Sequence, residues 1–104
     1  GMAIAVVNAA VTLTLGSDGR IGTARVALGA VAPTPVRSPH AEAVLRGQPL
    51  DEGVFAAAAR AVLYDIAPIS DVRGSAEYRR AAAVRLTARA LRLAAAQIAE
   101  EVRA

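Results

Sequence analysis

Two segments of alternating apolar and polar residues, joined by a short turn, constrain the fold of this chain more than any other feature. Residues 3–15 alternate in this way, as do residues 21–30, and strands with one buried face show this period. Between the segments, Asp18-Gly19 readily accepts the positive φ that a tight hairpin needs. The pattern therefore predicts a β-hairpin. The positions predicted to face inward are Val7, Ala9, Val11, Leu13, Leu15, Ala24, Val26 and Leu28.

Proline and capping residues mark the chain that follows the hairpin. Pro33 precedes residues 34–37 and Pro35 lies within them. Only a short edge strand is predicted there, because proline cannot donate to a sheet ladder. Ser38-Pro39 then supplies an N-cap and a first-turn proline for a short helix, which is predicted to end at Gly47.

Two more helices are predicted, the first from Asp51 to about Asp65 and the second from Ser75 to about Val102. The apolar residues of the last helix recur at spacings of three and four, which predicts one buried seam. The residues of this seam are Val84, Ala88, Leu91, Ala95, Ile98 and Val102, and Leu86, Ala90 and Leu93 widen it. Arg85, Arg89 and Arg92 form a separate charged stripe. The predicted fold class is α+β, with a three-stranded antiparallel sheet packed against three helices.

Composition limits what this fold can do. With 104 residues the chain is predicted to form one domain, residues 1–104, and Gly1 before Met2 resembles a tag remnant. One Phe, two Tyr and no Trp leave few large core residues, so the domain is expected to need a partner surface. All twelve basic residues are arginine, which fits a genome-wide compositional bias better than nucleic-acid binding.

No catalytic or metal-binding constellation is predicted. Cysteine is absent, and the single histidine, His40, has no second histidine or acidic cluster at ligand spacing; it is expected to be exposed. No apolar run is long enough to span a membrane, and no signal peptide is recognisable, which indicates a cytoplasmic protein with neither membrane nor nucleic acid as a partner.

Three sequence motifs carry a family resemblance. They are ALGAVAPTPVRSPHAEA at residues 27–43, RGQPLDE at residues 46–52 and ISDVRGSAEYRR at residues 69–80. In order and spacing they resemble the C-terminal domain of the FAD-binding (medium) subunit of molybdenum hydroxylases, the carbon monoxide dehydrogenase and xanthine dehydrogenase group. The resemblance covers residues 4–93 and implies three antiparallel strands covered by helices, in agreement with the periodicity.

The resemblance also sets an expectation for the cofactor. In this family, FAD is held mainly by the preceding domains, so this chain alone is expected to bind no cofactor, and FAD is implied only for the intact subunit. Small residues at the end of the second strand offer a weak candidate contact: Gly29, Ala30 and Val31. The alternative, which we favour, is that these residues only end the strand and turn the chain.

The polar segment before the last helix admits two interpretations. Its residues are Asp71, Arg73, Ser75, Glu77, Tyr78, Arg79 and Arg80. One interpretation is an anion clamp in which Arg73, Arg79 and Arg80 bind the anion and Tyr78 stacks on it. The other, which is favoured, is a structural motif or subunit interface: Ser75 caps the helix, Glu77 pairs with Arg80, and Tyr78 packs across helices.

The leading functional hypothesis is a non-catalytic domain that supports subunit assembly and electron transfer through FAD in an intact complex. Its partners would be the remaining flavin-subunit domains or the molybdenum and iron–sulfur subunits. A second hypothesis is a self-associating module without a redox role, whose wide apolar last helix forms a homodimer. A third is weak flavin binding by the chain alone.

Overall fold

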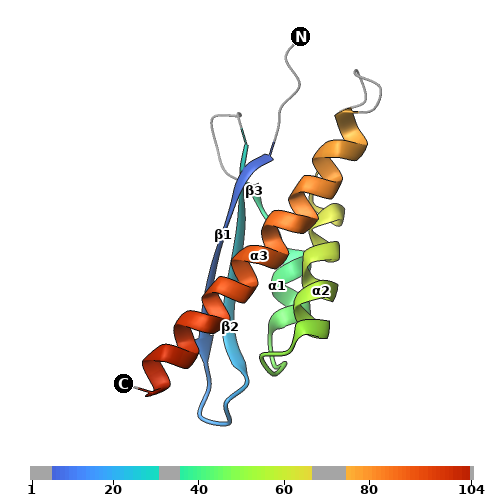
Figure 1. Cartoon of the computed structure of the whole chain (residues 1–104). Helices are drawn as coiled ribbons and strands as arrows, with labels where there is room; N and C mark the ends of the chain where they lie inside the picture. Colours follow the sequence, from blue (N-terminus) through green and yellow to red (C-terminus); the bar gives the residue numbers. More distant parts are fainter. Residues whose placement is uncertain (1–5, 31–35, 67–74, 104) are drawn as a thin grey trace.

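A computed structural model describes residues 6–30, 36–66 and 75–103 of the chain. The elements are strands β1 (Val6–Leu15), β2 (Ile21–Ala30) and β3 (Val36–Arg37), helices α1 (Pro39–Leu45) and α2 (Glu52–Ala61), a 3₁₀ turn η1 (Val62–Tyr64), and the long helix α3 (Ser75–Arg103). This order and composition confirm the predicted α+β fold (Figure 1). The predicted start of the first strand at residue 3 and of the third at residue 34 lie outside the described residues.

The three strands form one antiparallel sheet in the order β1-β2-β3. The predicted hairpin turn is present, with Gly19 at φ +79° and the Asp18 carboxylate accepting a hydrogen bond from the Arg20 N–H at 3.0 Å. Leu13 and Val26 are buried and Arg25 is exposed, as the alternation predicts.

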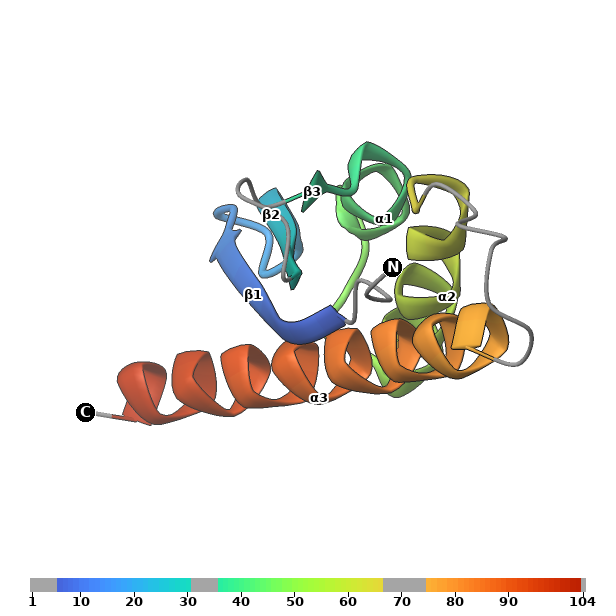
Figure 2. The ribbon, with the colours of Figure 1, turned by 90° about the horizontal axis from the view of Figure 1, so that it is seen from above.

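The helices form a layer against this sheet. α3 packs along β1, α1 packs on β2, and α2 packs against both α1 and α3 (Figure 2). The layer is held by small and branched side chains rather than by aromatic ones, because Phe55 is the only buried aromatic among the described residues. The larger buried apolar side chains are Leu13, Ile21, Val26, Leu28, Leu45, Phe55, Val62 and Leu91.

The helix ends follow the predicted capping chemistry. The Ser38 hydroxyl accepts a hydrogen bond from the Ala41 N–H, and one Asp51 carboxylate oxygen accepts from the N–H groups of Gly53 and Val54. The second predicted helix differs in its last turn, which is the 3₁₀ turn η1 instead of α-helix. Terminal turns often tighten in this way, because hydrogen bonds that span three residues instead of four satisfy carbonyls that an α-helix would leave free.

The seam predicted along α3 is correct in its centre and wrong at its end. Leu91 and Ala88 are buried, and Ala95 and Ile98 are partly buried against the core. Val102, however, is 75% exposed, because the C-terminal turns of α3 project past β1 and leave the sheet behind (Figure 2). Leu93, which was predicted to widen the seam, is 62% exposed, so the buried face of α3 is narrower than predicted.

A buried carboxylate joins the helix layer to the sheet. Glu42 of α1 is 3% exposed, and its Oε2 accepts a hydrogen bond from the Val26 N–H of β2 at 2.9 Å. Arg37 of β3 donates to both Glu42 oxygens, at 3.1 and 2.8 Å. Burial would raise the pKa of Glu42, but the hydrogen bonds from Arg37 and Val26, with the charges of Arg37 and Arg46, hold it below its usual value.

We predict that Glu42→Ala lowers the free energy of unfolding by about 2 kcal/mol, because it leaves the buried Val26 N–H without an acceptor. Urea titration at neutral pH measures this change. Glu101→Ala, which removes an exposed carboxylate from α3, is the control and should stay within about 0.5 kcal/mol of the wild type. Equal effects of the two substitutions would contradict a special role for Glu42.

The lowered pKa of Glu42 also predicts acid sensitivity. The unfolded chain binds a proton at this carboxyl more readily than the folded chain, so its stabilisation is complete above the ordinary pKa of 4.5 and disappears as the pH falls through the lower folded value. Between neutral pH and about pH 3, the wild type should therefore lose more stability than Glu42→Gln. Urea titrations of both proteins at each pH test this, and parallel losses would show that another group dominates.

Candidate functional site

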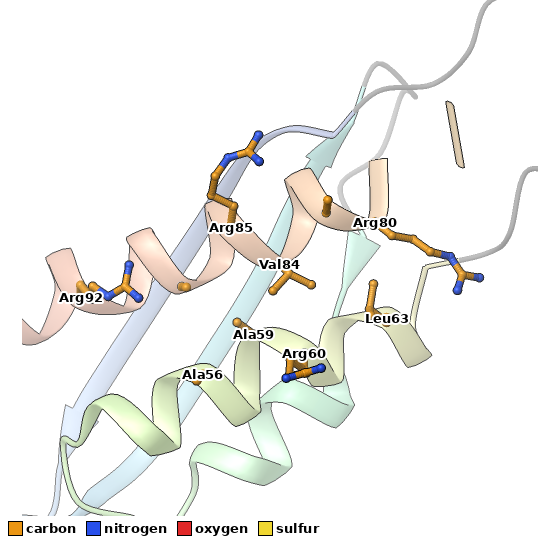
Figure 3. A pocket seen from close by; sticks show the side chains of 10 residues that line it. Ala56, Ala59, Arg60, Leu63, Arg80, Val84, Arg85 and Arg92 are labelled. Atoms are coloured by element: carbon orange, nitrogen blue, oxygen red, sulfur yellow. The ribbon is translucent and has the colours of Figure 1, made fainter. Parts of the chain in front are cut away.

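A groove runs between α2 and α3 on the helical side of the molecule (Figure 3). It exists because α2 presents alanines toward α3, and these side chains are too short to fill the space between the two helices. Its volume is about 500 Å³. The apolar residues that line it are Ala56, Ala59, Leu63, Ala81, Val84 and Ala88.

Four arginines line the same groove: Arg60 from α2, and Arg80, Arg85 and Arg92 from α3. The Arg80 side chain extends toward the η1 end, whereas the Arg85 guanidinium is turned outward, away from α2 (Figure 3). At the opposite end, Arg92 crosses to α2 and pairs with the Glu52 carboxylate at 2.6 Å. The hydrogen bond and the charge of Glu52 raise the pKa of Arg92. The groove is thus tied at one end by an ion pair and is cationic at the other.

A second hollow of about 640 Å³ adjoins this groove. The two share Arg60, Leu63 and Arg80, and the second continues past them to Val44 and Tyr64. The Tyr64 side chain is 78% exposed there. Together the hollows form a surface depression with an apolar floor, and none of the described residues that line it is acidic.

The structure divides the residues of the predicted polar segment. Asp71 and Arg73 lie outside the described residues, and Ser75 is the first residue of α3. Tyr78 is 67% exposed, so its ring does not pack across helices as the sequence predicted. Of the three arginines proposed as an anion clamp, Arg80 lines the groove, while the structure does not describe Arg73 or the side chain of Arg79.

The arginine stripe predicted on the last helix is also divided. Arg85 and Arg92 line the groove between α2 and α3, whereas Arg89 does not belong to its lining. Arg60, which completes the groove, was assigned no role from the sequence. The only signal that could have found it is its place on α2 among alanines, and that signal does not say which helix α2 faces.

The small residues at the end of β2 have a structural explanation. Gly29 lies opposite Asn8 in the sheet, and a Cβ atom at position 29 would overlap with the Asn8 amide oxygen. Glycine therefore makes room for a neighbouring side chain, which is reason enough for its presence. Ala30 is the last residue of β2, and Val31 lies outside the described residues.

His40 has partners that the sequence did not reveal. It is exposed, as predicted, but its Nδ1 lies 2.7 Å from Asp65 Oδ1, and its ring stacks on Tyr64 at a centroid distance of 5.2 Å. The other Asp65 oxygen accepts hydrogen bonds from the Ser38 hydroxyl at 2.6 Å and the His40 N–H at 3.1 Å. Burial opposes this arrangement by raising the pKa of Asp65, but the hydrogen bonds from Ser38 and His40 lower it below its usual value. The cluster fastens the start of α1 to the end of η1.

The described residues contain neither a metal site nor a membrane-spanning helix. In residues 6–30, 36–66 and 75–103, no group of three or more His, Cys, Asp or Glu side chains is placed to hold a metal ion. No helix in the part of the chain that the structure describes is long and apolar enough to cross a membrane.

The chain is an α+β domain with a groove between α2 and α3 that has an apolar floor and is cationic at one end. Comparison with known proteins identifies which domain it is. Residues 1–94 match the family model of the CO dehydrogenase flavoprotein C-terminal domain, and the chain belongs to this family. The resemblance inferred from its three motifs is thereby confirmed, and the chain is related to the FAD-binding subunits of molybdenum hydroxylases.

Individual relatives agree with this assignment. The chain is 40% identical over 62 residues to the putative xanthine dehydrogenase FAD-binding subunit XdhB of Escherichia coli, covering 60% of the chain and 21% of that protein. It is 42% identical over 72 residues to the nicotine 6-hydroxylase medium subunit of Paenarthrobacter nicotinovorans, covering 69% of the chain and 25% of that protein. The chain thus spans a quarter or less of the curated relatives it matches.

A solved structure shows the same fold. The carbon monoxide dehydrogenase of Hydrogenophaga pseudoflava, in a form that lacks the Mo-pyranopterin moiety of its cofactor, superposes with a TM-score of 0.70 at 39% identity. The match covers 85% of this chain and 30% of that one. At this level of identity the likeness extends to the sequence as well as the fold.

If the groove arginines serve binding and not folding, their removal should leave stability unchanged. We predict that Arg60→Gln keeps the free energy of unfolding within about 0.5 kcal/mol of the wild type, because Arg60 is exposed and belongs to none of the ion pairs among the described residues. Thermal unfolding followed by circular dichroism measures this. A large loss of stability would assign Arg60 to the structural framework.

Proposed function

We propose that this chain is a single, non-catalytic domain that serves as the C-terminal domain of the FAD-binding (medium) subunit of a molybdenum hydroxylase. In the intact complex it would support subunit assembly and electron transfer through FAD. The observation that carries the proposal is the family match over residues 1–94, in a chain whose likeness to carbon monoxide dehydrogenase covers 30% of that protein's chain.

The proposed partners are the remaining flavin-subunit domains or the molybdenum and iron–sulfur subunits. Exposed apolar and aromatic side chains support a docking role, since such groups are normally covered when they lie in interfaces. The most exposed of them are Tyr64, Tyr78, Leu93 and Val102. FAD would be held by the other domains of the subunit, and the proposed compartment is the cytoplasm.

Self-association without a redox role is the competing hypothesis, and the comparisons do not favour it. The relatives that match this chain are named as subunits of xanthine dehydrogenase and nicotine 6-hydroxylase. The exposed Leu93 and Val102 on α3 are compatible with either kind of contact, so solution stoichiometry must separate the two hypotheses.

The test combines the purified chain with the preceding domains of a FAD-binding subunit from the same genome, prepared without a C-terminal domain of their own. We expect a one-to-one complex by light scattering, with FAD retained by the partner. The chain alone should leave FAD fluorescence unchanged up to millimolar concentration. A stable homodimer that does not bind the flavin domains would overturn the proposal.

A further inference from the structure

We propose that the groove between α2 and α3 binds an acidic polypeptide segment that carries small apolar side chains. The groove would then be the surface through which this domain holds one of its neighbours. That the segment comes from another part of the hydroxylase complex rests on the proposed function. The chemistry of the segment is inferred from the residues that line the groove.

Charge is the first argument. Among the described residues, Arg92 is the one groove arginine that is paired with an acidic residue, Glu52. The Arg85 guanidinium is turned outward, so Arg60 and Arg80 supply the remaining positive charge of the groove. A positive field concentrated in a groove with low-dielectric walls attracts an acidic partner and orients it.

Length is the second argument. Arg80 and Arg92 are twelve residues apart on α3, which corresponds to about 18 Å along the helix axis. A single phosphate or carboxylate would occupy only part of a groove of this length. The adjoining hollow extends the depression further, to Tyr64. The occupant that fits is therefore an extended chain, with its negative charge placed at the Arg60 and Arg80 end.

The floor of the groove distinguishes polypeptide from nucleic acid. Ala56, Leu63, Ala81 and Val84 offer an apolar surface on which small aliphatic side chains can pack. Among the described residues, no aromatic ring lines the groove itself, and the adjoining hollow has one, Tyr64, whose ring already stacks on His40. Single-stranded nucleic acid is usually bound by stacking of successive bases on several such rings. An acidic peptide with alanine or leucine side chains satisfies both the cationic edges and the apolar floor.

The ion pair between Arg92 and Glu52 suggests how the occupant is positioned. It already neutralises one end of the groove, and both side chains are more than half exposed. The unneutralised charge therefore lies toward Arg60 and Arg80, near η1. The acidic residues of the occupant should concentrate at this end, which predicts that Arg60 and Arg80 dominate binding.

The experiment uses the full chain and two fluorescently labelled peptides of equal length. One alternates glutamate with alanine and leucine, and the other has glutamine at each glutamate position. Anisotropy titrations are made with the wild type, with the double variant Arg60→Glu/Arg80→Glu, and with Arg25→Glu/Arg89→Glu. The last is a matched control, because it changes the net charge equally at exposed positions outside the groove.

We expect the wild type to bind the glutamate peptide at least about tenfold more tightly than the glutamine peptide, with affinity that falls as salt rises. The groove double variant should lose about tenfold or more in affinity, and the matched control less than about twofold. Ala56→Leu, which fills the floor without changing charge, should also weaken binding. Circular dichroism verifies that each variant is folded.

Three results would overturn the inference. These are no binding of the glutamate peptide, an equal loss in the groove variant and the matched control, or tighter binding of a single-stranded oligonucleotide of equal charge through Arg60 and Arg80. The proposed function is judged separately, by assembly with the flavin domains. If the chain binds the peptide but does not assemble with the flavin domains, the inference about the groove stands and the proposed function is rejected. If the chain assembles with the flavin domains, the groove variant assembles equally well and neither binds the peptide, the proposed function stands and the inference about the groove is rejected.

Discussion

The buried carboxylate of Glu42 is the interaction on which the arrangement of layers depends. It comes from α1, yet its partners are the backbone of β2 and the guanidinium of Arg37 on β3. One side chain thus links the first helix to two strands and fixes the height of α1 on the sheet. Since α2 packs on α1, this contact also contributes to the position of α2, whereas α3 packs directly on β1. A buried carboxylate without these partners would be strongly destabilising, so α1, β2 and β3 must be in place together for Glu42 to be buried.

The abundance of alanine has two opposite effects on the helical layer. Where alanines are buried, as at Ala58 and Ala83, they let neighbouring backbones approach closely and compensate for the scarcity of large side chains. Where they lie between two helices near the surface, as at Ala56, they leave space that nothing in α2 or α3 fills. The groove is a consequence of the same composition that allows the core to close.

Local chemistry explains what the sequence could predict. The hairpin, the N-caps Ser38 and Asp51 and most helix ends depend on residues close in sequence, and alternation, proline and capping residues predict them correctly. The exception is the last turn of the second predicted helix, which is the 3₁₀ turn η1. The pairs that organise the structure are distant instead: Glu42 and Val26 are 16 residues apart, His40 and Asp65 are 25 apart, and Arg92 and Glu52 are 40 apart. Periodicity predicts which face of a helix is buried but not which element packs against that face, so the groove between α2 and α3 could not be predicted. The exposure of Val102 could not be predicted either, because an apolar seam does not show where the sheet beneath it ends.

The length of α3 has a geometric consequence for any assembly that uses it. One uninterrupted helix of 29 residues carries three of the four groove arginines and, further along it, the exposed side chains of Leu93 and Val102. Each residue of such a helix adds about 1.5 Å and about 100° of rotation. Two surfaces on the helix are therefore separated by a fixed distance along its axis and by a fixed rotation about it. A neighbour that contacts both must match the two values at once, and the number of residues between them becomes as much a determinant of fit as their identity.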